Sequence, residues 1–153
     1  MRIRLVSGLV ILCGLLVTSS QRAVSQDASA PANLQVHLNY TGSGTVDDKH
    51  KIYVALWDSA DFMSGQAMPV EIQSSADKRG TVTFSKVQKV PAYVSAAYDP
   101  KGEWDGQSGP PPEGSSLGLY SKTPGKPEPI DIKPGTTATV DLSFDDRIKM
   151  QAR

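Results

Sequence analysis

Apolar and polar residues alternate with a period of two along much of the chain after residue 33. This period is typical of β-strands that turn one face toward a core and the other toward water. It predicts strands over 34–40, 81–87 and 137–144. The apolar positions that define them are Leu34, Val36, Leu38 and Tyr40 in the first, Val82 and Phe84 in the second, and Ala138, Val140, Leu142 and Phe144 in the third.

Two further runs are apolar on both faces. Residues 51–57 and 92–98 have this character, which is typical of central strands that are covered on both sides. Shorter apolar segments predict short strands at 70–72 and 129–132, and 59–63 has room for one helical turn. The fold predicted from these seven strands is all-β: a single seven-stranded antiparallel β-sandwich, of the prealbumin-like or Ig-like Greek-key kind.

The longest stretch without a period is 99–125, which contains glycines and prolines throughout. Residues 145–153 are charged, and we expect them to be frayed or to form one helical turn. The domain predicted from the alternation therefore spans residues 34–145, with a flexible linker at 26–33 and a charged C-terminal tail at 146–153.

The N-terminal segment has a different pattern. Arg2 and Arg4 precede an apolar run over 5–17, and the small residues Ala23 and Ser25 follow. A basic start, a short apolar core and a small-x-small site are typical of a secretory signal peptide. The apolar run is shorter than the roughly 20 residues that a membrane span needs. The sequence therefore predicts a signal peptide at 1–25, export to the periplasm or the extracellular space, and no membrane insertion after cleavage.

Removal of that segment changes the charge and the cysteine content. It holds three arginines and no acid, so the chain's 16 basic residues fall to 13 against 16 acidic ones. It also holds Cys13, the chain's one cysteine, so the exported domain is predicted to have no disulfide. No basic stripe that could neutralise phosphates is visible, and the sequence thus predicts that nucleic acid is not a partner.

Three segments carry a family resemblance: 53–62, 80–84 and 91–99. The first is a strand that runs into an acidic loop, and the last is a strand that ends in Tyr98-Asp99. In this order they resemble prealbumin-like (transthyretin-like) sandwiches, including carboxypeptidase-regulatory-like modules of small secreted bacterial proteins. The resemblance covers most of 34–144 and implies a β-sandwich. The hydrolase branch of that family ends in Tyr-Arg-Gly-Ser, which this chain lacks at 148–153.

The acidic loop after Tyr98 offers one kind of chemistry. Carboxylates are the hard oxygen ligands that Ca²⁺ prefers, so a calcium-binding domain is one alternative, although Lys101 would place a positive charge beside the ion. No other cofactor is predicted. The candidate ligands are Asp99, Glu103, Asp105 and Glu113.

Aromatic residues around the same loop suggest a second kind of binding site. The loop is flanked or occupied by three aromatic residues, Tyr98, Trp104 and Tyr120. An exposed indole beside carboxylates could stack on a sugar ring or bind a protein partner. The competing interpretation is that Trp104 folds back over the end of the sandwich. Trp57, on an apolar strand, is predicted to be a core residue.

Catalysis has weaker support. A nucleophile needs an adjacent base, and His37 and His50 are both predicted to be solvated surface residues. A small hydrolase that uses the carboxylates of Asp58 and Asp61 is a third hypothesis. The sequence favours a non-enzymatic binding or accessory module for an unknown protein or carbohydrate partner, with loop 99–120 as its interaction face.

Overall fold

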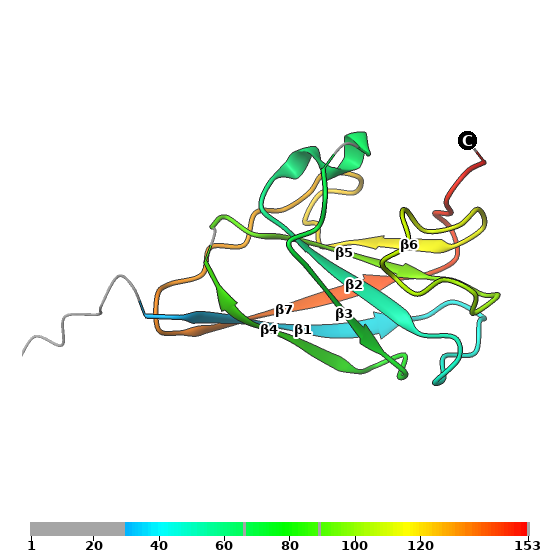
Figure 1. The fold of residues 1–153 in the computed structure, drawn as a ribbon, viewed down its shortest axis with the longest axis horizontal. Coiled ribbons are helices and arrows are strands. Elements are labelled where there is room, and N and C mark those ends of the chain that lie inside the picture. The colour runs from blue at the N-terminus through cyan, green and yellow to red at the C-terminus, as the bar shows by residue number, and fades with distance from the viewer. Residues whose placement is uncertain (1–29, 66, 89, 153) are drawn as a thin grey trace, which may run out of the picture.

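The computed structural model describes residues 30–65, 67–88 and 90–152. The predicted signal peptide at 1–25 and residues 26–29 of the predicted linker lie outside this part of the chain. Two β-sheets pack face to face, as Figure 1 shows, so the predicted all-β sandwich is confirmed. The strands are β1 (Ala32–Tyr40), β2 (Ile52–Trp57), β3 (Glu71–Ser75), β4 (Thr81–Val87), β5 (Tyr93–Tyr98), β6 (Ser116–Leu119) and β7 (Thr137–Phe144).

The sheet pairing is mixed, and the prediction of a wholly antiparallel sandwich is wrong. One sheet has the order β4-β1-β7 and the other has the order β3-β2-β5-β6. All neighbours are antiparallel except β1 and β7, which run parallel in continuous register from Asn33 opposite Thr137 to Tyr40 opposite Phe144. Parallel neighbours need a long connection, and here the other strands of the sandwich form that connection.

One predicted strand is not formed, and one observed strand was not predicted. Residues 129–132 form only an isolated bridge, in which Ile130 and Ala92 exchange backbone hydrogen bonds of 2.9 and 2.7 Å. In its place β6 lies within the stretch predicted to be irregular. Its sequence, Ser-Leu-Gly-Leu, has too few apolar positions to show a period, and Gly118 is needed because a Cβ there would lie 2.7 Å from Cγ of Phe144.

The core lies between the inner faces of the two sheets. The alternation of β1 is reproduced directly, since Leu34, Val36, Leu38 and Tyr40 are all buried. Phe84 of β4 and Leu142 of β7 fill the centre with them. The strand begins two residues before the predicted domain boundary, so Ala32 and Asn33 belong to β1 and not to a linker.

The two strands predicted to be central are central, but β2 is not covered equally on both sides. Ile52, Val54 and Leu56 are buried, whereas the alternate side chains, Trp57 among them, are half-buried on the outer face. The prediction that Trp57 is a core residue is therefore wrong. Its ring stacks on Phe62 at a centroid distance of 4.8 Å, and Nε1 donates to Oγ of Ser95 at 2.9 Å.

The C-terminal segment is neither frayed nor helical. The N–H of Leu117 donates to the carbonyl of Ile148 at 2.9 Å, and that of Met150 donates to the carbonyl of Ser115 at 2.9 Å. Residues 148–150 thus extend the second sheet beyond β6. This pairing places Asp146 where its carboxylate accepts from Tyr40 and Ser116.

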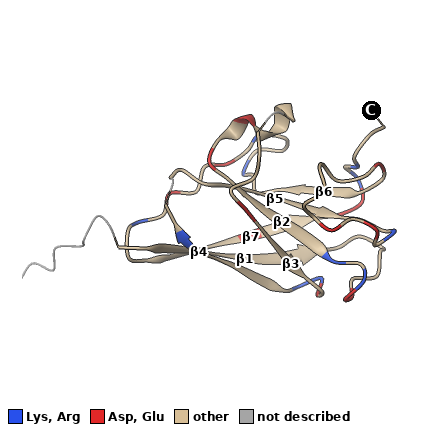
Figure 2. Cartoon of the chain, viewed as in Figure 1, with Lys and Arg blue, Asp and Glu red and all other residues tan. Residues whose placement is uncertain are grey.

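The predicted helical turn is confirmed as the 3₁₀-helix η1 (Ala60–Ser64). Ser59 caps it by accepting from the N–H of Asp61 at 3.1 Å. Within the described ranges, no helix is long and apolar enough to span a membrane. Figure 2 shows acidic and basic residues interspersed along the loops and strands.

Candidate functional site

The loop that follows β5 is built around the buried carboxylate of Asp99. This side chain is 2 % exposed, and its Oδ1 accepts from the N–H of Lys101 at 2.9 Å. Its Oδ2 accepts from the N–H groups of Glu103 and Trp104 at 2.9 and 3.0 Å. Burial alone would raise the pKa of Asp99, but these backbone donors outweigh it and hold the pKa below its ordinary value. The buried carboxylate of Asp99 therefore fixes the backbone of residues 101–104.

The second acidic residue organises the outer part of the loop. Oδ1 of Asp105 accepts from the N–H groups of Gln107 and Ser108 at 2.8 and 2.7 Å. The hydroxyl of Ser108 donates to Oδ2 at 2.6 Å. The hydrogen bond from that hydroxyl, together with the two backbone donors, lowers the pKa of Asp105 to about 2. The carboxylate is charged at neutral pH and is exposed at the surface.

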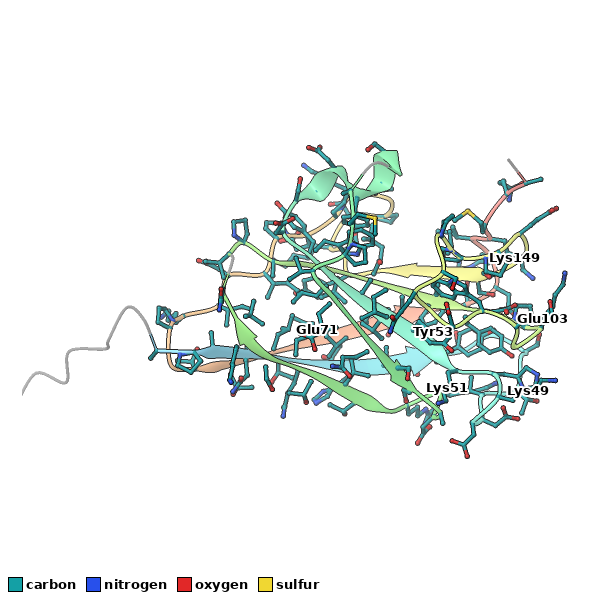
Figure 3. The ribbon with its side chains drawn as sticks, in the orientation of Figure 1. Lys49, Lys51, Tyr53, Glu71, Glu103 and Lys149 are labelled. Carbon is teal, nitrogen blue, oxygen red and sulfur yellow. The ribbon has the colours of Figure 1, made fainter. Side chains whose placement is uncertain are left out.

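Trp104 rests against the outer face of the second sheet. Its ring meets Tyr53 of β2 edge-on, with the ring centroids 5.0 Å apart and the planes at 64°. Figure 3 shows Tyr53 and Glu103 at the same end of the sandwich. Gly106 allows the close approach, because a Cβ there would lie 2.3 Å from the Tyr53 ring and φ is +81°.

The indole is thus half-buried, and its Nε1 is fully enclosed. Within the part of the chain that the structure describes, this N–H has no hydrogen-bond acceptor. An enclosed donor without an acceptor costs about 1–3 kcal/mol. The predicted alternatives for Trp104 both have a structural counterpart, since it covers the end of the sheet and also borders the loop surface.

A shallow pocket of about 320 Å³ lies against this indole. Glu103, Asp105 and Ser108 supply polar atoms on its wall, and Lys101 supplies a charge of opposite sign. Pro110 and Pro112 complete the wall as a stiff apolar side. The pocket therefore combines an aromatic surface, hydrogen-bonding groups of both kinds and a rigid apolar flank.

The structure does not bring the three predicted aromatic residues together. Tyr98 is 2 % exposed and lies inside the core, where its hydroxyl donates to the carbonyl of Thr45 at 2.8 Å. Tyr120 follows β6 at the opposite end of the sheet, because its N–H donates to the carbonyl of Val94. Of the three, Trp104 alone lines the pocket.

The predicted calcium ligands are also divided. Glu103 and Asp105 line the pocket, Asp99 lies beneath it with both oxygens accepting backbone hydrogen bonds, and Glu113 is exposed on a later turn. Among the described residues, no group of three or more histidine, cysteine or acidic side chains is placed to hold a metal ion.

The carboxylates of the hydrolase hypothesis lie elsewhere. Asp61 is exposed on η1, and Asp58 is exposed at the rim of a smaller pocket of about 150 Å³. The apolar residues that line that pocket include Leu56, Val70 and Val87. The two histidines each bond to one carboxylate: His37 to Asp141 at 3.3 Å and His50 to Asp47 at 2.9 Å.

A cluster that the sequence pattern did not indicate surrounds Asp146. Its Oδ1 accepts from the hydroxyls of Tyr40 and Ser116 at 2.5 and 2.7 Å, and its Oδ2 accepts from the backbone N–H of Ser43 at 2.8 Å. The hydrogen bond from Tyr40 is the largest cause that holds the pKa of Asp146 well below its ordinary value. Tyr40 and Asp146 are separated by 106 positions, so no local motif could have indicated their contact.

No protein-family model, no curated protein and no solved structure matches this chain.

Proposed function

We propose that this chain is an exported, non-enzymatic β-sandwich module that binds a carbohydrate in the pocket beside Trp104. The observation that carries the proposal is the composition of that pocket, in which an indole, two carboxylates, a hydroxyl and an ammonium group surround about 320 Å³. Sugar rings present axial C–H groups to aromatic faces and hydroxyls to carboxylates, so this set of groups suits them. Export, to the periplasm or the extracellular space, is supported by the leader-like pattern of residues 1–25.

The rigidity of the site supports binding over catalysis. The loop is held by backbone hydrogen bonds to Asp99 and Asp105, and the indole is pressed against Tyr53. A preorganised site loses little conformational entropy when a ligand binds. Neither histidine lines the pocket. We also propose that the chain is related to prealbumin-like sandwiches, which its two packed sheets and the acidic loop after β5 support.

The test exploits the two tryptophans of the chain. We expect Trp104→Ala to weaken binding of the best glycan from an oligosaccharide panel at least about tenfold, because a buried aromatic contact in a binding site is worth more than 1 kcal/mol. Isothermal titration of the purified protein measures the effect, and circular dichroism checks that the fold is kept.

The matched control is Trp57→Ala, which removes the indole that stacks on Phe62 away from the pocket. It should leave the affinity within about twofold. Equal losses in both variants would contradict a site at Trp104. Binding of a peptide library in the absence of any glycan binding would replace the carbohydrate by a protein partner.

A further inference from the structure

Strand β7 lies at the edge of the three-stranded sheet. This strand pairs with β1 on one side only and has no neighbour on the other side within its sheet. The N–H of Asn33 donates to the carbonyl of Thr136, and that of Thr41 donates to the carbonyl of Phe144, both at 2.9 Å. Backbone groups of successive strand residues point to opposite edges, so the even-numbered carbonyls face β1. The backbone groups of the odd-numbered residues Thr137, Thr139, Asp141 and Ser143 therefore face outward.

Other sheet edges of the described chain carry features that discourage pairing. β6 is covered by residues 148–150, and β3 is only five residues long. β4 carries Lys86 with a φ of 59° beside a shift in its register with β1. Short strands, bulges and lysines are devices by which natural sheets avoid association at their edges.

β7 has none of these features. It is eight residues long, keeps an unbroken register with β1, and contains no proline, glycine or lysine. Its one charged residue, Asp141, is paired with His37 at 3.3 Å. The outward-facing backbone groups take part in no hydrogen bond outside the strands in the part of the chain that is described. The edge of β7 therefore offers backbone donors and acceptors with which another strand can pair.

We propose that a second copy of this chain occupies the edge, with the two β7 strands antiparallel about a two-fold axis at Val140. In an antiparallel pair, residues that oppose each other lie on the same face of the sheet. Val140, Ala138 and Leu142 are on the inner face, and Thr139 and Asp141 are on the outer face. An axis at Val140 keeps every inner residue opposite an inner residue.

This register also pairs the outward-facing backbone groups and keeps the two Asp141 carboxylates from facing each other. Thr139 lies opposite Asp141 of the second copy, and Thr137 lies opposite its Ser143, so all the outward-facing groups become paired. The hydroxyl of Thr139 can donate to the carboxylate opposite. An axis at Asp141 would instead place two carboxylates face to face, which is destabilising. An axis at Thr139 would place Ser143 opposite Gly135 of the second copy, which lies outside β7.

A proline at one outward-facing position tests the proposal. Proline is tolerated at a sheet edge where the N–H faces away from the ladder, so Thr139→Pro should keep the fold. We expect the protein purified from cells that express the full chain to sediment with the mass of two copies. Thr139→Pro should raise the dimer dissociation constant about tenfold or more, because each copy loses a donor at the centre of the new ladder.

The matched control is Thr83→Pro. Thr83 is exposed on the edge strand β4, and its backbone groups also face outward, because Leu38 of β1 donates to Gly80 and Val36 pairs with Val82. The control should leave the mass at two copies. A wild-type protein that has the mass of one copy at all concentrations would overturn the proposal. So would a loss of the dimer in Thr83→Pro alone.

A crosslinking experiment tests the register without relying on proline. In the double variant Thr139→Cys, Asp141→Cys, the thiol at position 139 of one copy lies opposite the thiol at position 141 of the other. Mild oxidation should therefore yield a covalent dimer on a non-reducing gel. Asp141→Cys alone should not crosslink, since only the competing register places position 141 opposite itself. Crosslinking of this single variant, or none in the double variant, would contradict the axis at Val140. The pocket beside Trp104 takes no part in this interface, so each proposal can fail without the other.

Discussion

At the residue scale, the carboxylate of Asp146 accepts four hydrogen bonds, from Tyr40, Ser43 and Ser116. It joins the end of β1 through Tyr40, the following turn through Ser43, and the start of β6 through Ser116. Ser116 is 1 % exposed, so its hydroxyl depends on this carboxylate as its acceptor. Burial, followed by the bond to Asp146, raises the pKa of Tyr40 above its ordinary value, which keeps its hydroxyl a donor at all physiological pH values.

We expect Asp146→Asn to lower the free energy of unfolding at pH 7 by about 1–3 kcal/mol, because charge-assisted hydrogen bonds are weakened and a buried donor loses its acceptor. The pKa of Asp146 is lower in the folded state than in the unfolded state. Its contribution is therefore fully present above the unfolded pKa of about 4 and is lost as pH falls toward the folded pKa. Urea titrations between pH 7 and pH 2 measure this dependence.

The variant should show a shallower loss of stability with acid than the wild type. Asp145→Asn is the control, because the neighbouring carboxylate accepts from exposed Arg147, at 2.9 Å from the backbone N–H and 2.7 Å from the side chain. An acid dependence of Asp146→Asn identical to that of the wild type would show that ionisation of Asp146 contributes no stability.

At the scale of elements, β6 connects the site to the core. It follows the Trp104 loop, pairs with β5, and presents Gly118 to the side chains of Leu142 and Phe144 on β7. The absence of a side chain at Gly118 lets the second sheet lie close to the first at this edge. Residues 148–150 then cover the outer side of β6.

We expect Gly118→Ala to lower the free energy of unfolding by about 1–3 kcal/mol, because the added Cβ would lie 2.7 Å from Cγ of Phe144 and must displace it. Chemical denaturation measures the loss. Gly109→Ala is a control for the loss of a glycine, since a Cβ there meets no atom within 4 Å, although its φ of +80° adds backbone strain. A stability of Gly118→Ala equal to that of the wild type would mean that the two sheets can separate locally without cost.

At the scale of the whole molecule, the loop after β5 continues from one sheet, and the unpaired edge of β7 belongs to the other. These two surfaces are built from different segments, so the proposed ligand site and the proposed dimer interface share no residue. Figure 3 shows Glu103, from the loop after β5, at the end of the sandwich where Tyr53 of β2 lies.

Calcium binding can be tested through the stability of the whole domain, because a cation bound to the folded state raises the melting temperature by mass action. We expect millimolar Ca²⁺ to leave the melting temperature unchanged. The reason is that both oxygens of Asp99 already accept backbone N–H groups, and Asp105 accepts from Gln107 and Ser108. Differential scanning calorimetry with Ca²⁺ and with Mg²⁺ as a control measures the shift. A rise of several degrees with Ca²⁺ alone would restore the calcium-binding alternative.

The site was predictable in part. Trp104, Glu103 and Asp105 are neighbours in sequence, so the sequence alone placed them on one loop, and the structure adds Lys101, Ser108 and the prolines to the same pocket. Tyr98 and Tyr120 were grouped with them by proximity in sequence. The direction of β5 and β6 then carries Tyr120 to the far end of the sheet, and the alternation of β5 turns Tyr98 into the core.

The alternation along the chain is enough to identify which face of each strand is buried. A period-two pattern fixes which side chains of β1, β4 and β7 are buried, because a one-residue slip would expose all of them. Only the tertiary structure decided which strands meet: the parallel pairing of β1 with β7, the addition of residues 148–150 to β6, and the contact of Asp146 with Tyr40. Those contacts join distant segments, and their free energy comes from the mutual fit of two sheets, which a local pattern does not contain.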